Sequence, residues 1–386
     1  MRILIVVGKD LSLERGSNVH VLEVATCLEE LGNEVFLFCY KKPRVRARQP
    51  AHVLSLPLPK IRYIRYIWFL LSSFFYLLYY VIRWNPDIVY SRISPIFIHP
   101  TLITLITRRP HVVEVNGFIR DELVIAGTGR IRRFVANLNE KITYSAASKI
   151  IAVTQGLKDV LVETFNLPAD KVTVLHNGVN THLFQPIESS VARRMLGLCD
   201  AGPLVLFVGY LIKWQGIDTL FKSVSRILHE CPGTRFLIVG EGPDREHLDD
   251  LGAKLDIRKK MIFAGEVPGE MVPWYINASD ICVAPFTKAR NARIGLSPLK
   301  LYAYMACGKP VIASDIKGVG DLIRTAKCGI VIDPDNPESL AVATIELLQD
   351  KVRRDCLGEA GRKAVIKDYS WKLIAHRLEC ILREVF

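Results

Sequence analysis

Two arginines, a serine–proline pair and a lysine lie close together in "RNARIGLSPLK", in the second half of the chain. Serine is a good helix N-cap and proline suits the first helical turn, so we expect a helix to begin at Ser297 and Pro298, after a loop carrying Arg290 and Arg293. Free N–H groups at a helix N-terminus attract anions, and Lys300 in the first turn adds a full charge. The stretch favours a diphosphate site, although a capped core helix beside a solvated basic loop has the same pattern.

Glycines follow two other apolar runs of the second half. In "LFVGYLIKWQG" a strand precedes Gly209, and Lys213 is placed to reach an anion. In "IVGEGP" a strand precedes Gly240 and Glu241. Glycine lets a ligand approach the backbone closely, and open parallel sheets bind ligands outside the carboxyl ends of their strands. The two stretches strengthen the prediction of an anion site.

The first half offers weaker polar signals at strand ends. Gly16, Ser17 and Asn18 would open the first helix, where they can cradle a sugar or a phosphate or form a simple turn. In "VEVNGFIRDE" the pair Asn116 and Gly117 follows a strand, and "LHNGVN" (175–180) is similar. We interpret the histidines at 20, 99 and 176 as structural rather than catalytic, although His20 on the first helix can reach the site.

The elements that must position these residues alternate along the chain. Strand, helix and strand at 2–7, 16–31 and 34–39 predict a βαβ unit and a parallel sheet. Further strands are predicted at 87–90, 111–115, 149–153, 172–175, 204–208, 235–239, 261–263, 280–284, 311–313 and 329–332. The pattern restarts after residue 202. We predict an α/β protein with an N-terminal domain (1–180), a C-terminal domain (203–365) and a last helix (366–386) that packs back on the first domain.

Composition narrows the class of partner. The chain has 386 residues, half of them hydrophobic, and a formal net charge of +12. This balance favours anionic partners: nucleic acid, an acidic membrane surface or phosphorylated small molecules. The nine cysteines are scattered without CxxC spacing, so we expect neither a zinc site nor a disulfide framework, and a reducing cytoplasm. We expect no signal peptide and, since no nucleic-acid-binding motif is present, no nucleic-acid partner.

The segment 62–84, "RYIRYIWFLLSSFFYLLYYVIRW", is aromatic, apolar and flanked by arginines. A helix over its uncharged part would be about 25 Å long, just short of the bilayer core. A membrane span would also put strands of one parallel sheet on opposite sides of the membrane, so we exclude it. Two interpretations stay open: a buried helix, or a partly exposed helix that contacts an anionic membrane surface, which the basic run 41–48 favours.

The motifs together resemble a known family. "LHNGVN", "FVGYLIKWQG", "VGEGP", "ASDICVAPF" and "SPLKLYAYMACGKPVIAS" follow one another in an order similar to that of GT-B glycosyltransferases of the GT4 type, and the resemblance covers essentially the whole chain. It implies two Rossmann-like domains facing across a cleft, a nucleotide-sugar donor held mainly by the second, and an acceptor on the first. It also implies transfer with retention at the anomeric carbon and no metal or other cofactor.

The resemblance, with the residue patterns above, yields a set of candidate site residues. The predicted catalytic residues are Asn116, Lys213 and Lys300, and the predicted acceptor-binding residues are His20, Asn116 and Gly117. The predicted donor-binding residues are Gly16, Ser17, Gly209, Tyr210, Lys213, Gly240, Glu241, Arg290, Arg293, Ser297, Pro298, Leu299, Lys300 and Ala303.

Five positions depart from the family pattern. Tyr210 and Gln215 stand where arginine and lysine are common, so Lys213 and the 290–300 cations must carry more of the diphosphate charge. Gly295 and Ala303 stand where the family often has two glutamates; the second usually bonds the donor ribose, and the loss of that hydrogen bond would cost about 1.5–3 kcal/mol. Asn116 stands where a histidine is usual, so it can hydrogen-bond a sugar but cannot act as acid or base.

These features predict a retaining hexosyltransferase that uses a nucleotide-diphosphate sugar, with a UDP-sugar favoured and a GDP-sugar possible. The acceptor is predicted to be lipid-linked or a cell-surface glycan precursor, as in polysaccharide biosynthesis. We expect the protein to be cytoplasmic and peripherally bound to the inner face of the cell membrane. The alternative is a weakened or inactive nucleotide-sugar-binding protein, which Ala303 favours, whether natural or engineered.

Overall fold

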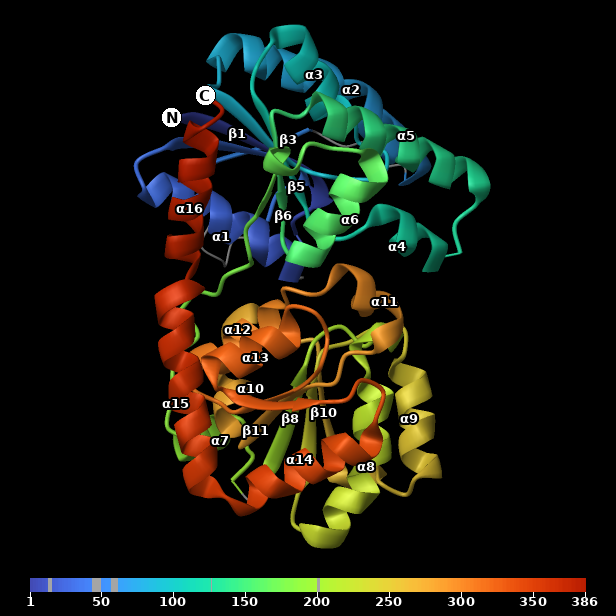
Figure 1. The fold of residues 1–386 in the computed structure, drawn as a ribbon, viewed down its shortest axis with the longest axis vertical. Coiled ribbons are helices and arrows are strands. Elements are labelled where there is room, and N and C mark those ends of the chain that lie inside the picture. The colour runs from blue at the N-terminus through green and yellow to red at the C-terminus, as the bar shows by residue number, and fades with distance from the viewer. Residues whose placement is uncertain (13–15, 44–49, 57–61, 126, 200–201) are drawn as a thin grey trace. The chain divides into compact units, whose positions relative to one another are not determined.

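The chain forms two parallel β-sheets, each accompanied by helices (Figure 1). The computed structural model describes residues 1–12, 16–43, 50–56, 62–125, 127–199 and 202–386. Unit 1 comprises Met1–His176 and Trp371–Phe386, and unit 2 comprises Asn177–Ser370. Each unit has the strand order of a Rossmann-like domain, which confirms the predicted α/β class.

The sheet of unit 1 has the order β3-β2-β1-β4-β5-β6-β7. Its strands are β1 (Arg2–Asp10), β2 (Glu34–Lys41), β3 (His52–Ser55), β4 (Ile88–Arg92), β5 (His111–Val115), β6 (Lys149–Ala152) and β7 (Val172–Val174). Its helices are α1 (Gly16–Glu30), α2 (Arg62–Trp84), α3 (His99–Thr107), α4 (Ile119–Ile125), α5 (Arg130–Ala146), α6 (Gln155–Phe165) and α16 (Trp371–Arg383), and η1 (Ala169–Lys171) precedes β7.

Both faces of this sheet are covered, which explains the continuous apolar runs of its central strands. Successive side chains of a strand point to opposite faces. In β1, Ile5 and Val7 face α1, whereas Leu4 and Val6 pack with residues of α2 and α3. Helix α16 runs beside α1, so the last helix of the chain belongs to unit 1 (Figure 1).

The sheet of unit 2 has the order β10-β9-β8-β11-β12-β13. Its strands are β8 (Leu204–Val208), β9 (Arg235–Val239), β10 (Met261–Gly265), β11 (Ile281–Ala284), β12 (Val311–Ser314) and β13 (Gly329–Ile332). Its helices are α7 (Ser189–Met195), α8 (Ile217–Glu230), α9 (Arg245–Lys254), α10 (Val272–Ala278), α11 (Lys288–Ile294), α12 (Leu299–Ala306), α13 (Val319–Ala326), α14 (Pro337–Gln349) and α15 (Lys351–Asp368), with short 3-10 helices η2 (Lys213–Gln215), η3 (Arg258–Lys260) and η4 (Gly269–Met271).

The fold differs from the sequence prediction in two places. The strand β3 was not predicted, because a four-residue edge strand with an exposed first residue and three half-buried ones has no apolar run. The segment between the two predicted domains, residues 181–202, is part of unit 2, where α7 packs against α10. The chain passes between the units at His176–Asn177 and again at Ser370–Trp371.

Helix α2, over segment 62–84, has one buried side and one exposed side. Phe69, Leu77 and Val81 are buried in the core of unit 1. The opposite side exposes Trp68, Leu71, Phe75, Tyr79 and Ile82, each 47–71% exposed. Among the described residues, no helix is both long enough and apolar enough to cross a membrane. The side chains of residues 62–67 and most of the basic run 41–48 lie outside the described residues.

Candidate functional site

The carboxyl ends of three strands in unit 2 consist largely of backbone. Gly209 follows β8, Gly240 follows β9 and Gly265 ends β10, with φ values of 147°, 129° and 71°. The Gly209 N–H donates to the Val239 carbonyl at 2.9 Å, and the Gly240 N–H donates to the Gly265 carbonyl at 2.7 Å. A Cβ on Gly240 would lie 2.0 Å from the Gly209 oxygen. The glycines are therefore required by both conformation and space.

Lys300, in the first turn of α12, reaches this edge. Its Nζ donates to Gln215 Oε1 at 2.7 Å and lies 3.8 Å from the centre of the Phe207 ring. A Cβ on Gly209 would lie 2.7 Å from the same Nζ. Burial among these groups lowers the pKa of Lys300 well below its ordinary value. In the described part of the chain the side-chain partner of Lys300 Nζ is the neutral Gln215 amide and not a carboxylate, so an anionic ligand would supply the countercharge that favours the ammonium form.

The predicted partner Lys213 is placed differently. It is exposed at the start of η2, and the residue of that turn that contacts Lys300 is Gln215. Tyr210 is 49% exposed beside them, and Glu241 pairs with Arg245 at 3.5 Å. The sequence analysis did not predict Gln215 and the Phe207 ring as parts of the site. Both contact Lys300, which is 85 positions from Gln215, and such a distant contact leaves no local pattern.

The start of α12 corrects the prediction that Ser297 caps the helix. The helix begins at Leu299 after Pro298, and no side chain caps it. Ser297 Oγ instead accepts from the Asn177 N–H at 3.0 Å and lies 3.0 Å from the Tyr302 hydroxyl. The Asn177 amide also donates to the Ser297 carbonyl at 2.6 Å. The serine thus anchors the preceding coil, and the first-turn N–H groups have no side-chain cap, as an anion site requires.

Asn177 was not among the predicted site residues, although "LHNGVN" was singled out. Its side chain is 9% exposed and its Oδ1 has no hydrogen-bond partner among the described residues. The long sequence distance to Ser297 hid this contact. A polar residue next to a glycine, just after a predicted strand, was the available signal.

The two arginines before α12 lie on a helix rather than on the predicted loop. Helix α11 holds both, and its Asn291 side chain donates to the carbonyls of Trp214 and Thr287. Those bonds tie α11 to the η2 turn. Arg293 is exposed, and the side chain of Arg290 lies outside the described residues. Ala303 is 8% exposed in the core of unit 2 and offers no polar group.

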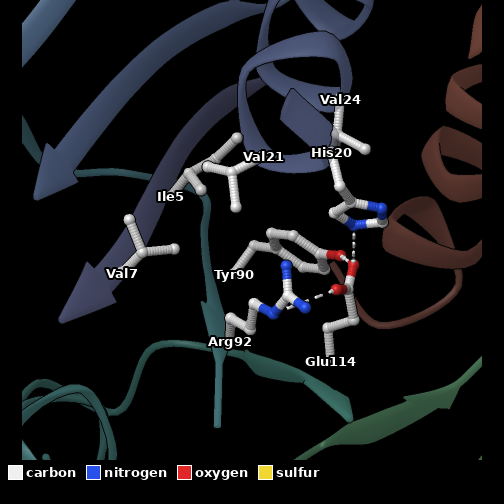
Figure 2. Close-up of a pocket in the computed structure, with 8 residues that line it drawn as sticks. All are labelled: Ile5, Val7, His20, Val21, Val24, Tyr90, Arg92 and Glu114. Carbon is white, nitrogen blue, oxygen red and sulfur yellow. Dashed lines mark hydrogen bonds and ion pairs between the residues drawn. The ribbon is translucent and has the colours of Figure 1, made fainter. Parts of the chain in front are cut away.

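In unit 1 the comparable position holds a buried carboxylate (Figure 2). Glu114 lies in β5 with 4% exposure, and its Oε2 is 2.8 Å from His20 Nε2 on α1. The Tyr90 hydroxyl donates to the same oxygen, and the Asn116 amide donates to Oε1. Arg92 Nε approaches Oε1 at 3.9 Å. We call Glu114, His20, Tyr90, Arg92 and Asn116 the Glu114 cluster.

The charge of Glu114 is stabilised by its partners. Burial alone would raise the pKa of this carboxyl group, but His20, Arg92 and the Tyr90 hydrogen bond outweigh burial and lower it. Burial and the adjacent carboxylate raise the pKa of Tyr90 well above its ordinary value, so Tyr90 remains a donor. The cluster is therefore an ionised carboxylate surrounded by donors, which orients the Asn116 amide but is a poor proton acceptor.

The cluster brings together two of the predicted acceptor residues, His20 and Asn116, and Gly117 next to Asn116 is buried. His20 also makes an edge contact with Trp371 of α16 at 5.0 Å. His99 bonds Ser73 and His176 bonds the Val153 carbonyl. Gly16 is exposed at the start of α1, and the Ser17 side chain lies outside the described residues. An acid inside the buried strand "HVVEV" was the signal for Glu114 that the sequence analysis did not use.

Comparisons with known proteins agree with this architecture. Residues 15–183 match "Glycosyltransferase Family 4" and residues 202–350 match "Glycosyl transferases group 1". An uncharacterized glycosyltransferase of Methanocaldococcus jannaschii is 32% identical over 237 residues, which is 60% of this chain and 59% of that protein.

Two further proteins have named ligands. The "GDP-mannose-dependent monoacylated alpha-(1-6)-phosphatidylinositol monomannoside mannosyltransferase" of Corynebacterium glutamicum is 31% identical over 215 residues, 54% of this chain and 55% of that protein. The chain thus matches a little over half the length of these two relatives. The Anabaena protein HepE, solved in complex with UDP-glucose, has a TM-score of 0.79 and 16% identity over 100% of both chains, a likeness of fold.

Proposed function

The chain belongs to the GT4-type glycosyltransferases of the GT-B fold, and from this we propose that it transfers a sugar from a nucleotide-diphosphate sugar to an acceptor. One observation carries the proposal: the uncapped start of α12 and the Lys300 ammonium meet the glycine edge of β8 and β9 in unit 2. Amide donors, a cation and close access to the backbone are what a diphosphate needs.

The chemical step follows from this placement. The acceptor hydroxyl oxygen bonds to the anomeric carbon as the bond between the sugar and the diphosphate breaks, and the hydroxyl proton passes to the leaving oxygen, on which negative charge develops. The first-turn N–H groups of α12, Lys300 and Lys213 stabilise that charge, which is the main catalytic contribution we assign to the protein. Asn116 hydrogen-bonds the acceptor, with its amide oriented by Glu114. We propose retention at the anomeric carbon and no metal requirement, on the basis of the family resemblance.

The test is release of free nucleotide from a donor. Purified protein is incubated with UDP- and GDP-sugars and a membrane lipid extract that supplies acceptors, with and without EDTA, and nucleotide diphosphate is measured with the wild type and Lys300→Met. We expect release that EDTA does not change and that the variant slows at least tenfold. Release at the wild-type rate by Lys300→Met would remove the proposed role of Lys300, and no release from any donor would contradict glycosyl transfer.

We propose a UDP-sugar as the favoured donor and a GDP-sugar as the alternative. HepE was solved with UDP-glucose, and the Corynebacterium relative is named for GDP-mannose. Ligands that bind only the native state raise the melting temperature. A thermal-shift screen of UDP, GDP and ADP therefore ranks the bases, and a larger shift with GDP than with UDP would reverse our preference.

We propose a lipid-linked acceptor or glycan precursor, reached by a cytoplasmic protein that binds peripherally to the anionic inner face of the cell membrane. The name of the Corynebacterium relative includes a phosphatidylinositol acceptor. The apolar side of α2 supports the same idea, because Trp68, Phe75 and Tyr79 are exposed on it. Replacing Trp68 and Phe75 with serine should reduce binding to anionic vesicles, and unchanged binding would refute a role for α2.

A second function has a specific observation in its favour. Ala303 lies where the family usually has a glutamate, and it offers no acceptor to a ribose hydroxyl. A weakened or non-catalytic nucleotide-sugar-binding protein is the function this residue favours. Donor binding without nucleotide release, together with release gained by Ala303→Glu, would establish this second function in place of the first.

A further inference from the structure

Helix α5 of unit 1 is amphipathic, but its apolar side faces outward and its polar side faces the core. Its outward side carries Ile131, Phe134, Val135 and Leu138, which are 82%, 67%, 43% and 49% exposed. These positions follow the i, i+3, i+4, i+7 spacing of a single helical stripe. A surface helix of a water-soluble domain normally turns such a stripe toward the core. The exposed stripe therefore needs an explanation outside unit 1.

The inward side of α5 is largely polar and hydrogen-bonds to other parts of unit 1. Asn139 donates to the Ser94 carbonyl at 2.7 Å, and Thr143 bonds Thr101 at 2.9 Å. Glu140 is 0% exposed and accepts from the Tyr144 hydroxyl at 3.2 Å. The bonds of Asn139 and Thr143 to Ser94 and Thr101, outside α5, fix which side of the helix faces inward. The outward stripe is thus a consequence of specific contacts rather than of a helix that can turn over.

Arginines flank the outward stripe at the start of the helix. Arg130 and Arg132 are exposed and Arg133 is half-buried. The first turn of α5 has no acidic residue. Cations at a helix N-terminus oppose the helix dipole, so these arginines do not serve the stability of α5. Apolar residues with flanking arginines are the composition of helices that lie in the interface of an anionic membrane.

We propose that the outward side of α5 is a binding surface for an anionic lipid membrane. Ile131, Phe134 and Leu138 enter the boundary between headgroups and acyl chains, while the arginines meet lipid phosphates. The biological use of this surface rests on the proposed function: membrane binding would hold the enzyme where a lipid-linked acceptor lies. It assigns a membrane contact to a part of the chain separate from α2.

Helix α3 lies next to both α2 and α5 (Figure 1). Its Leu105 and Ile106 are 54% and 61% exposed, and Arg108 at its end is exposed. A second copy of the chain is a poorer occupant of α5. The exposed residues of α5 include no carboxylate that could pair with the arginines of a second α5, because Glu140 is buried, whereas lipid phosphates complement them.

The experiment is vesicle sedimentation with the full chain. Neutral phosphatidylcholine vesicles are compared with vesicles containing about 30% phosphatidylglycerol, using two α5 variants. The first replaces Phe134 and Leu138 with asparagine, and the second replaces Arg130 and Arg132 with glutamine. The matched control is Val352→Asn in α15 of unit 2, where Val352 is 74% exposed. Thermal unfolding of every variant confirms that it folds.

We expect wild type and the control to bind the anionic vesicles equally and both α5 variants to bind at least tenfold more weakly, since one arginine near a charged surface contributes about fivefold. Wild-type binding by folded α5 variants would overturn the inference. So would a wild-type dimer, seen by light scattering, that the α5 variants dissociate while their vesicle binding is unchanged.

The vesicle-binding experiment can fail or succeed independently of the nucleotide-release experiment that tests the proposed function. Loss of vesicle binding by the α5 variants supports the inference even if no nucleotide release is ever detected. Retained binding by the α5 variants, with binding lost in the α2 variants, refutes the inference and leaves the proposed membrane-bound glycosyl transfer intact.

Discussion

The carboxyl ends of the strands present backbone groups in unit 2 and side chains in unit 1. In unit 2 the edge is backbone: Gly209, Gly240 and Gly265 hold positive φ angles, and neighbouring strand ends touch without side chains between them. In unit 1 the edge is a set of side chains held by one buried carboxylate, Glu114. A backbone edge admits an anion closely, whereas a side-chain cluster fixes hydrogen-bond directions, as recognition of a sugar hydroxyl requires.

The largest expected effect breaks the backbone edge. Gly240→Ala places a methyl group 2.0 Å from the Gly209 oxygen at a φ of 129°, and we expect a loss of more than about 3 kcal/mol in the free energy of unfolding. Urea denaturation measures it. The matched control is Gly252→Ala in α9, where the added Cβ would lie 3.5 Å from the Phe221 ring. This control should be neutral or stabilising by about 0.5–1 kcal/mol, and equal effects of the two changes would contradict the account.

The second prediction breaks the side-chain cluster. Glu114→Gln leaves His20 and Arg92 without their shared carboxylate, and we expect a loss of about 1.5–3 kcal/mol at neutral pH. Because the folded pKa of Glu114 is lowered, its contribution is present above the ordinary carboxyl value of 4.5 and is lost as pH falls below it. The variant should therefore lose stability less steeply on acidification than the wild type.

Tyr90→Phe is the control for this prediction. It removes one donor to Glu114 but keeps the charge, so we expect a smaller loss, about 1 kcal/mol, and a smaller change in the dependence on acid than Glu114→Gln causes. An acid profile of Glu114→Gln that coincides with the wild-type profile would show that the carboxylate is not ionised in the fold.

The third prediction concerns ligand affinity at the backbone edge. Lys300→Met should weaken nucleotide-diphosphate binding about 10- to 100-fold, as expected for a lost charged hydrogen bond, with little change in stability. Since the pKa of Lys300 is lowered, wild-type affinity should also begin to fall at a lower pH than an ordinary lysine would allow. Calorimetric titration measures both. Lys222→Met, at an exposed position of α8, is the control, and an equal loss there would refute a local role.

The smallest expected effect sharpens the comparison within unit 1. Burial raises the pKa of Glu140 to about 7, and Arg120 only partly opposes this. A raised carboxyl pKa means that the folded state holds the proton more strongly, so stability falls as pH rises from about 4.5 to about 7. Glu140→Gln should remove that fall and raise the melting temperature at pH 8 by about 2–4 °C per kcal/mol recovered. A variant that melts below the wild type at pH 8 would contradict this sign, which is opposite to that of Glu114.

Much of the fold could be predicted from the sequence, because local patterns of residues determine where strands and helices form. Apolar runs bounded by turn residues located most of the strands, and glycines after strands marked Gly209 and Gly240, since only glycine tolerates those backbone angles. Helix α2 was predicted as a helix that is either buried or partly exposed, and it has one buried side and one exposed side. The short edge strand β3 was not predicted, because its half-buried residues do not form a periodic apolar pattern.

Contacts between residues far apart in the sequence were decided by the tertiary structure alone. Ser297 was expected to cap its own helix, but Asn177, 120 positions earlier, binds its hydroxyl. Glu114 gains its partner His20 from 94 positions away, and α5 shows its apolar stripe outward because Ser94 and Thr101 bind its polar side. Propensity and periodicity report which elements form. Only packing chooses which side of a helix faces the core and which donor a buried oxygen meets.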